Sequence, residues 1–248
     1  MSRLPEYYSQ LTPFRALFEQ GNPILTYHKI GPSSARPRMK GLYLSAQLFR
    51  RQLEELSAAG FTSGSLDTCA SARQGRKLVV TFDDGYTNVL SHTLQPLAET
   101  GFKAVQFLVA DLLGKCNEWD MPLGEIPEPM MDLEQIHDWL AAGHDIGSHT
   151  LTHPHLTLLP PDRAREEIVA SKKKLEDFFA RPVTHFCYPY GDWNEAVRAL
   201  VMEAGYRTAC ITDPGVNDAQ TSPFLLKRIT ARYQTRSLKK LVSWFLRQ

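Results

Sequence analysis

The sequence predicts an α/β fold in which short strands alternate with longer helices around a parallel sheet. Short apolar runs rich in β-branched and aromatic residues alternate with amphipathic segments along most of the chain. Glycines follow several amphipathic segments, at the place where a left-handed residue ends a helix. The 248 residues, 43% of them hydrophobic, suffice for a single domain with its own core. The alternation favours a parallel sheet, either closed as a barrel or open and doubly wound.

The apolar runs predict seven strands, at residues 23–27, 77–82, 104–109, 144–147, 183–188, 208–211 and 225–229. The amphipathic segments predict helices at residues 45–59, 87–100, 132–142, 162–179, 194–204 and 237–246. The glycines just past four of these helices are Gly60, Gly101, Gly143 and Gly205. Parallel α/β folds place their chemistry at the carboxyl ends of the strands. Asp83, His149 and Tyr190, which follow strands, are therefore expected to share one rim.

The remaining segments define the ends of the domain and one long connection. We expect residues 1–22 to form a helical extension before a main domain at 23–248. The N-terminus lacks an apolar segment with a cleavage site, and no stretch reaches about 18 apolar residues, which predicts a cytoplasmic protein without a membrane span. Residues 111–131 lack clear periodicity and predict an extended loop over the rim, either an insertion without function or a substrate cover through Trp119 and Asp120.

The charge balance limits the kinds of partner. Lys and Arg number 28 against 27 Asp and Glu, which removes the electrostatic case for nucleic acid or anionic membranes as the main partner. Neutral sugars remain compatible with this balance. The four cysteines lie far apart without a CxxC pair, so we expect reduced core residues and no disulfide framework.

Two adjacent carboxylates end the second predicted strand. Asp83 and Asp84 precede Gly85, whose backbone freedom permits the break in the pleat that two neighbouring side chains need in order to converge. Their mutual repulsion must be offset by a cation, a shared proton or full solvation. A solvated Asp-Asp-Gly turn explains these residues equally well when they are taken alone.

The histidines after the fourth predicted strand favour the cation. Three of the eight histidines, His149, His153 and His155, fall within seven positions. Histidines four residues apart within one helical turn have Cβ atoms about 6 Å apart and can reach one ion. Two imidazoles and one carboxylate make an open site for Zn²⁺ or a similar divalent ion. One aspartate would then bind the metal while the other takes a proton from metal-activated water, a chemistry suited to amide hydrolysis.

These motifs resemble those of the polysaccharide deacetylases with a NodB-type domain, carbohydrate esterase family four. The resemblance rests on Thr81-Phe82-Asp83-Asp84-Gly85, on His149-Thr150-Leu151-Thr152-His153-Pro154 and on Phe186-Cys187-Tyr188-Pro189-Tyr190-Gly191. It implies a distorted (β/α)7 barrel as a single domain. Ile24-Leu25-Thr26-Tyr27-His28 and the Tyr-Pro-Tyr-Gly run are closest in style to exopolysaccharide poly-N-acetylglucosamine N-deacetylases.

The resemblance also implies a division of roles within the site. Asp83 is the general base, and Asp84, His149 and His153 hold the metal, Zn²⁺ first and Co²⁺ or Ni²⁺ as alternatives. The backbone N–H of Tyr190 stabilises the oxyanion. The residues that we expect to contact substrate are Tyr188, Pro189, Tyr190, His28, Trp119 and His155. The substrate would be an N-acetylated oligosaccharide, polysaccharide or glycolipid precursor of the N-acetylglucosamine type, which loses acetate.

The family's Asp-Trp fourth motif is not evident in the chain, and two further departures bear on the roles within the site. Cys187 replaces the arginine that orients the base in many members, so another group must tune Asp83. The late histidine that serves as general acid is not visible, since Leu225-Leu226-Lys227-Arg228 occupies that region; His155 and His28 are the candidate proton donors. Two alternatives therefore stay open. One is a deformylase or cyclic-amide hydrolase on the same barrel, and the other is a glycan-binding member with impaired catalysis.

Overall fold

Seven parallel strands form the sheet at the centre of the molecule, and each matches a predicted strand. The computed structural model describes residues 5–32, 40–73, 75–123 and 126–232. The strands are β1 (Asn22–Tyr27), β5 (Lys77–Phe82), β6 (Ala104–Leu108), β7 (Asp145–Ser148), β8 (His185–Cys187), β9 (Thr208–Cys210) and β11 (Ile229–Thr230). They pair in the order β1-β5-β6-β7-β8-β9, and on its other side β1 pairs in parallel with β11 and, at its start, antiparallel with Val216–Asn217. The parallel α/β prediction is confirmed.

The segment before β11 closes the barrel. Leu226 forms a parallel bridge to Cys210 at the end of β9, and its N–H donates to the carbonyl oxygen of Ala209 at 2.9 Å. Three residues later the same segment enters β11 and pairs with Leu25 and Thr26 of β1. The closure on the β9 side is short and irregular. The single-domain, distorted (β/α)7 barrel is therefore confirmed.

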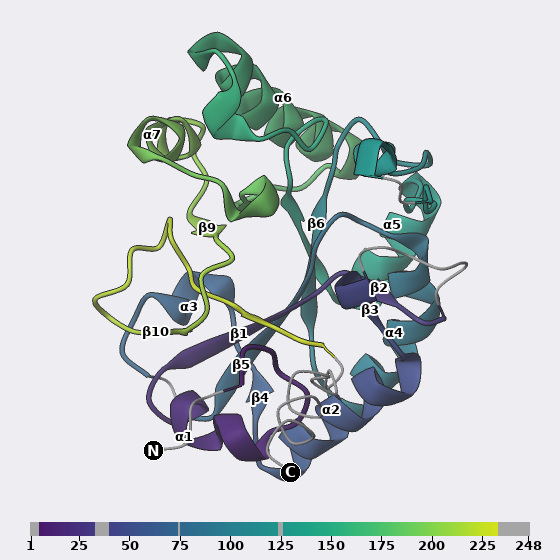
Figure 1. The fold of residues 1–248 in the computed structure, drawn as a ribbon, viewed down its shortest axis with the longest axis vertical. Coiled ribbons are helices and arrows are strands. Elements are labelled where there is room, and N and C mark those ends of the chain that lie inside the picture. Colours follow the sequence, from purple (N-terminus) through teal and green to yellow (C-terminus); the bar gives the residue numbers. More distant parts are fainter. Residues whose placement is uncertain (1–4, 33–39, 74, 124–125, 233–248) are drawn as a thin grey trace, which may run out of the picture.

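Helices cover the outside of this sheet, from α2 through α4 and α5 to α6 and α7 around its edge (Figure 1). They are α2 (Ala46–Ala58), α4 (Thr87–Thr100), α5 (Leu133–Ala141), α6 (Pro161–Phe179) and α7 (Glu195–Glu203). The glycines after α2, α4, α5 and α7 all have φ between 72° and 81°, as their sequence positions predicted. The predicted helix at 237–246 lies outside the described residues.

Short elements that the sequence did not predict connect the barrel units. The short strands are β2 (Lys29–Ile30), β3 (Tyr43–Leu44), β4 (Thr62–Ser63) and β10 (Val216–Asn217), and the short helix is α3 (Leu66–Cys69). The 3₁₀ helices are η1 (Thr12–Phe14), η2 (Lys40–Leu42), η3 (Met121–Leu123), η4 (Leu156–Leu158) and η5 (Pro189–Gly191). Two to four residues carry too little periodicity to be recognised in a sequence.

The N-terminal residues pack against the barrel. Helix α1 (Arg15–Phe18) places Phe18 in the same buried cluster as Tyr8 and Phe14, with ring centroids 5.4 to 5.8 Å apart. The N–H of Tyr8 donates to the carbonyl oxygen of Thr230 at 2.9 Å, which ties this segment to β11. The division into an extension at 1–22 and a catalytic domain at 23–248 stays a prediction.

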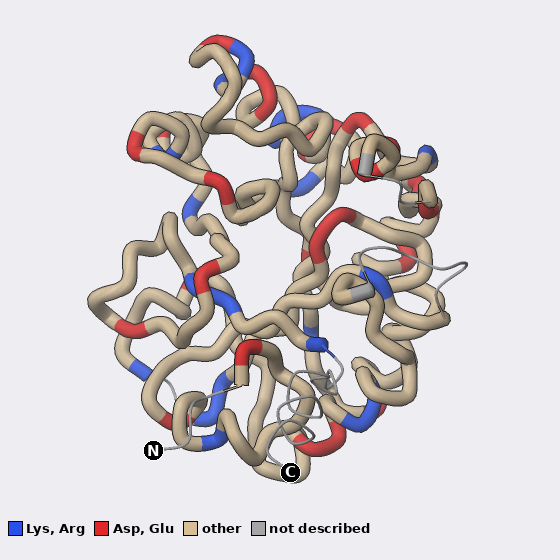
Figure 2. The backbone as a smooth tube through the Cα atoms, in the orientation of Figure 1, with Lys and Arg blue, Asp and Glu red and all other residues tan. Residues whose placement is uncertain are grey.

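The register of the sheet brings the carboxyl ends of the strands to one rim. Tyr27 pairs with Phe82, Phe82 with Gln106, and Ser148 with Phe186. The residues that follow these strands therefore emerge on the same side of the barrel. Figure 2 shows Lys, Arg, Asp and Glu interspersed along the described chain. Among the described residues, no helix combines the length and apolar composition that crossing a bilayer requires.

Candidate active site

A cavity of about 390 Å³ opens at this rim, and the two aspartates and two of the histidines line it. Asp83 and Asp84 follow β5, His149 follows β7, and His153 lies four residues further on. All four side chains are buried, with residue exposures between 2% and 6%. Four ionisable groups buried together require partners for their charge, because burial in a low-dielectric interior disfavours an isolated charge.

Unusual backbone conformations shape this cavity. Four non-glycine residues at or beside it have positive φ: Asp84 (74°), Thr150 (71°), His153 (66°) and Tyr190 (60°). Each left-handed residue with a side chain costs about 1 kcal/mol or more, so surrounding contacts must hold these turns. The break in the pleat after Asp83 thus involves Asp84 itself as well as Gly85, whose φ is 101°.

Asp84, His149 and His153 converge on one point. The Asp84 Oδ1 atom lies 3.4 Å from the Nε2 atoms of both His149 and His153. Ligand atoms about 2.1 Å from a tetrahedral zinc ion lie about 3.4 Å from one another. The three side chains thus fit the ligand set of a divalent ion with a further position open.

The hydrogen bonding of His149 supports the same fit. Its Nδ1 lies 2.7 Å from the carbonyl oxygen of Cys187. A carbonyl oxygen can only accept, so Nδ1 carries a proton, and Nε2, which faces Asp84, is the ring nitrogen left for a metal. This is the arrangement by which proteins orient metal-binding imidazoles.

The route by which the two histidines converge differs from the prediction. Residues 149–155 do not form a helical turn, so helical spacing does not bring His149 and His153 together. A tight turn with left-handed Thr150 and His153 does so, and the N–H of His153 donates to Thr150 Oγ1 at 3.0 Å. The predicted proximity of the two histidines is therefore correct, but the helical turn that was expected to cause it is absent.

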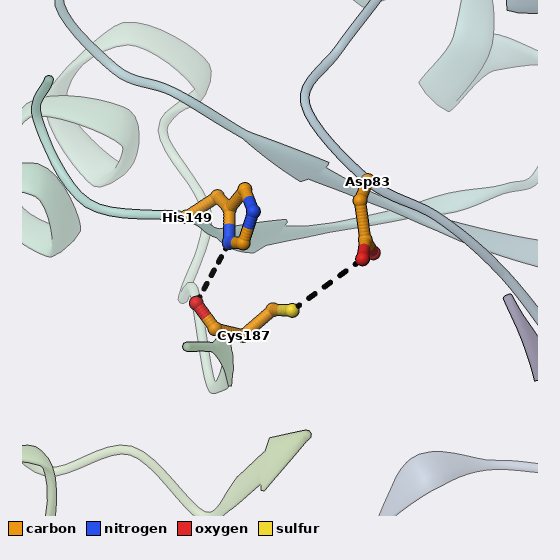
Figure 3. A group of neighbouring side chains, drawn as sticks. All are labelled: Asp83, His149 and Cys187. Atoms are coloured by element: carbon orange, nitrogen blue, oxygen red, sulfur yellow. Dashed lines mark hydrogen bonds between the residues drawn. The ribbon is translucent and has the colours of Figure 1, made fainter. Parts of the chain in front are cut away.

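A second group of possible ligands shares His149 with the first. Asp83, His149 and Cys187 also bring one ligand atom each within 4.8 Å of the others. Figure 3 shows Cys187 between the other two, with its carbonyl oxygen toward His149 and its sulfur toward Asp83. The distance from Cys187 Sγ to Asp83 Oδ2 is 3.8 Å. Both Asp83 oxygens, however, already accept hydrogen bonds from Arg228. The geometry therefore favours the group around Asp84 as the metal site.

Arg228 forms a bidentate ion pair with Asp83. Its Nη1 donates to Oδ1 at 2.6 Å and its Nη2 to Oδ2 at 2.8 Å, in the planar fork that suits a carboxylate. The same Nη2 lies 3.1 Å from Cys187 Sγ, and Arg228 is only 1% exposed. The guanidinium thus reaches Asp83 from the residue before β11, beside the small Cys187 side chain. The sequence prediction missed this role, although an arginine within an apolar strand pattern was a signal for it.

The charges set the protonation of the two aspartates. Burial raises the pKa of Asp83, but the charge and hydrogen bonds of Arg228 lower it more, so the pKa lies below its ordinary value. For Asp84, burial also raises the pKa, but the hydrogen bond from His149 and the electrostatic interaction with the two imidazoles lower it more, so this pKa too lies below its ordinary value. Both carboxyl groups are therefore ionised at neutral pH.

The two histidines differ in protonation. Burial lowers the pKa of His153 to about 3, which leaves a neutral imidazole. Burial also lowers the pKa of His149, but Cys187 and the hydrogen bond to Asp84 raise it well above its ordinary value. A cation that binds His149 Nε2 must displace a proton there, so metal binding weakens as the pH falls.

Aromatic rings frame the candidate metal site. Trp119 stacks on the His153 ring at 4.4 Å and 24°, and Tyr190 meets the same ring edge-on at 4.6 Å. Trp119 and Asp120 both line the cavity, so the loop predicted at 111–131 reaches the site. Cys116 of this loop pairs with Pro129 through an isolated bridge.

The predicted substrate contacts divide into two sets. His28, Trp119, Tyr188 and Tyr190 line the cavity, whereas Pro189 and His155 are not among its lining residues. His155 stacks on the Tyr190 ring at 3.9 Å, and its Nδ1 lies 3.6 Å from Asp192 Oδ2. The described lining also includes residues without a recognisable sequence signal, namely Glu6, Tyr7, Leu42, Thr212, Pro214, Thr230 and Arg232.

Comparisons with known proteins agree with this geometry. Residues 70–209 match the family model described as "Polysaccharide deacetylase". The chain is 26% identical over 213 residues to "Putative polysaccharide deacetylase YxkH" of Bacillus subtilis, covering 84% of this chain and 70% of that protein. It is 30% identical over 136 residues to the peptidoglycan-N-acetylglucosamine deacetylase of Bacillus cereus, covering 53% of this chain and 54% of that protein. The structure of IcaB from Ammonifex degensii superposes with a TM-score of 0.75 at 23% identity, covering 91% and 97% of the two chains.

The geometry predicts one tight Zn²⁺ site per chain. Asp84→Asn and His153→Ala each remove a ligand and should weaken Zn²⁺ binding by more than about 100-fold in calorimetric titrations. His155→Ala is the control, because His155 pairs with Asp192 away from the three ligands. Equal weakening in all three variants, or no binding by the unmodified protein, would contradict the assignment.

Proposed function

Because the chain belongs to the polysaccharide deacetylase family, we propose that it removes the N-acetyl group from a glycan of the N-acetylglucosamine type and releases acetate. This makes it a hydrolase of carbon–nitrogen bonds other than peptide bonds. The observation that carries the proposal is the different environment of two adjacent carboxylates. Asp84 faces two imidazole Nε2 atoms at 3.4 Å, while Asp83 faces a guanidinium.

The metal that Asp84, His149 and His153 would hold is most simply Zn²⁺, with Co²⁺ or Ni²⁺ as alternatives. When bound, such an ion polarises the acetamide carbonyl and lowers the pKa of a water molecule to about 7. The three ligands come from two rim segments, and the Trp119 ring stacks on the imidazole of His153.

Asp83 is the proposed general base. Arg228 keeps its carboxylate ionised and fixes the orientation of both oxygens, so the carboxylate can accept a proton from the attacking water. We assign the backbone N–H of Tyr190 to the developing oxyanion, because Tyr190 lies on the rim beside His153. A preformed donor at this position would lower the barrier by about 3 kcal/mol.

His28 is the proposed carrier of the proton to the leaving amine. Its Nε2 lies 3.8 Å from Asp83 Oδ2, and its ring lines the cavity. Burial lowers the pKa of His28, although Asp83 and Asp84 raise it in part, so the imidazole is neutral before the reaction. The proton that Asp83 takes from water can then pass to His28 and on to the amine nitrogen. His155, which is half exposed and paired with Asp192, does not face Asp83.

The aromatic frame supports a sugar substrate. Trp119 and Tyr190 flank the metal ligands, and Tyr190 is 43% exposed. Flat apolar rings with polar groups at their edges suit the faces of a pyranose. Tyr188 lines the cavity and its hydroxyl donates to the carbonyl oxygen of Phe224 at 3.3 Å, which fixes the ring. Arg228 also favours turnover over a binding-only role, because it supplies the guanidinium that Cys187 does not.

Acetate release tests the proposed reaction directly. Chitooligosaccharides and partly acetylated glucosamine polymers, incubated with the protein and Zn²⁺, should yield acetate and free amine. Asp83→Asn removes the base and should lower kcat by about 10² to 10⁴. Formate from N-formylated sugars, or ring opening of cyclic amides, without acetate would favour another hydrolase reaction. Unchanged kcat in Asp83→Asn would refute the proposed base.

The pH profile tests the role of Arg228. Arg228→Met removes the cation that lowers the pKa of Asp83, so that pKa rises and the acidic limb of the kcat/KM profile moves to higher pH. At the optimum, loss of orientation should lower kcat/KM on the order of 10²-fold. Arg207→Met is the matched control, because Arg207 forms an exposed ion pair with Asp67. An unmoved acidic limb in Arg228→Met would show that the ion pair does not set the base.

The role of His28 predicts a loss confined to catalysis. His28→Gln should lower kcat by about 10² to 10⁴ while Zn²⁺ affinity stays at the level of the unmodified protein. His137→Gln is the control, because His137 is exposed and packs against Phe179. If His28→Gln retains full kcat, another group protonates the amine.

A further inference from the structure

The short turn at residues 149–153 carries two of the three proposed metal ligands and depends on strained backbone. Thr150 and His153 both have positive φ, and the turn has no regular secondary structure of its own. Left-handed residues of this kind revert to other conformations unless neighbouring groups hold them. The position of His153 Nε2 beside Asp84 Oδ1 therefore requires an external support for the turn.

Glu167 of α6 provides that support. Its Oε2 accepts hydrogen bonds from the N–H groups of Leu151 and Thr152, both at 2.9 Å. Its Oε1 accepts a third from the hydroxyl of Thr152 at 2.7 Å. All three donors belong to the two residues between Thr150 and His153. One carboxylate thus binds the middle of the ligand turn at three points.

The burial of Glu167 makes these contacts specific. The residue is 3% exposed, and among the described residues no cation lies within ion-pair distance of it. A buried carboxylate without such donors would lose its hydration without replacement, so the three hydrogen bonds are what keep it there. Charge-assisted hydrogen bonds of this kind are about twice as strong as neutral ones.

The same face of α6 also contacts the strand that precedes the turn. Ser171 lies one helical turn after Glu167, and its Oγ is 2.7 Å from the Oγ of Ser148, the last residue of β7. Helix α6 therefore contacts the chain on both sides of His149. Residues four apart on a helix share a face, which explains how one helix reaches both places.

We propose that Glu167 is a positioning residue for the metal site, which holds the turn at 149–153 in the conformation that brings His153 to Asp84. This inference rests on the proposed metal-binding role of Asp84, His149 and His153. Without the carboxylate, the N–H groups of Leu151 and Thr152 lose their partner and the strained turn relaxes. The ligand set is then no longer assembled before the ion arrives, and metal affinity falls.

The decisive test is the Zn²⁺ affinity of Glu167→Ala, measured by calorimetry on the full chain. Loss of a group that orients metal ligands typically weakens binding by about 10- to 100-fold, and we expect a change of that size. Glu167→Gln should keep most of the affinity of the unmodified protein. The glutamine amide oxygen can accept from the N–H groups of Leu151 and Thr152, and the glutamine amide NH₂ can donate to Thr152 Oγ1. The Co²⁺ absorption spectrum should change in Glu167→Ala and return in Glu167→Gln.

Glu176→Ala is the matched control on the same helix. Its Oε1 accepts from the N–H of Val183 at 2.9 Å and from Lys172 Nζ, so it also binds a connecting segment, but one without metal ligands. Zn²⁺ affinity should be unchanged in Glu176→Ala even if its melting temperature falls. If Glu167→Ala does not fold, Glu167→Asp, one methylene too short for the turn, takes its place with the same expected loss.

The outcomes separate this inference from the proposed function. Unchanged Zn²⁺ affinity in Glu167→Ala, or an equal loss in Glu176→Ala, overturns the positioning role. If Asp84→Asn and His153→Ala weaken binding but Glu167→Ala does not, only the inference fails. If Asp84→Asn and His153→Ala also leave binding unchanged, the proposed metal site itself is wrong. If Glu167→Ala weakens binding but no acetate is released from any substrate, the positioning role stands and the proposed reaction is wrong.

Discussion

Two adjacent carboxylates buried at the end of one strand are the constraint on which the rest of the site depends. Asp83 and Asp84 cannot both be buried and ionised unless each receives its own positive partner. The fold separates them through the left-handed conformation of Asp84. Asp83 then meets the guanidinium of Arg228 from the segment that closes the barrel, while Asp84 meets two imidazoles from the turn after β7. Different partners give two neighbouring aspartates different environments, and the roles proposed for them rest on this difference.

The barrel provides these partners because parallel strands end at one rim. Strand β5 lies between β1 and β6, so its end lies next to His28 after β1, and the turn that follows β7, two strands away, also reaches Asp84. The irregular closure between β9 and β1 brings Arg228 into the interior, where it also donates to the carbonyl oxygen of Ile211 and to Thr26 Oγ1. These contacts fix the guanidinium independently of Asp83. A rigid cation can orient a base, whereas a mobile one cannot.

Much of the fold and part of the site could be predicted from the sequence. Strand β5 was recognisable from its β-branched run, and the ends of α4 and α5 from Gly101 and Gly143, because these signals are local. The proximity of Asp84, His149 and His153 came from motif spacing and resemblance. The left-handed turn that creates this proximity was not predicted, since its conformation is held by Glu167, which lies 14 residues beyond His153.

The role of Arg228 also could not be predicted from local sequence signals. Sequence reasoning identified Cys187 as a departure and concluded that another group must tune Asp83, yet nothing local to Arg228 points across the barrel to a residue 145 positions earlier. An ion pair across the barrel depends on the order in which the strands pair and on how the sheet closes. No single segment of the sequence determines that order. Glu6 and Tyr7 reach the cavity in the same way, through the backbone pairing of Tyr8 with the end of β11.

The most direct test of the central claim is an anomalous diffraction map at the zinc absorption edge from crystals of the Zn²⁺-loaded protein. The account predicts one peak about 2.0 to 2.2 Å from Asp84 Oδ1 and from the Nε2 atoms of His149 and His153, with Asp83 still paired to Arg228. A peak bound instead by Asp83 and Cys187, or none at the rim, would contradict the division of roles between the two aspartates.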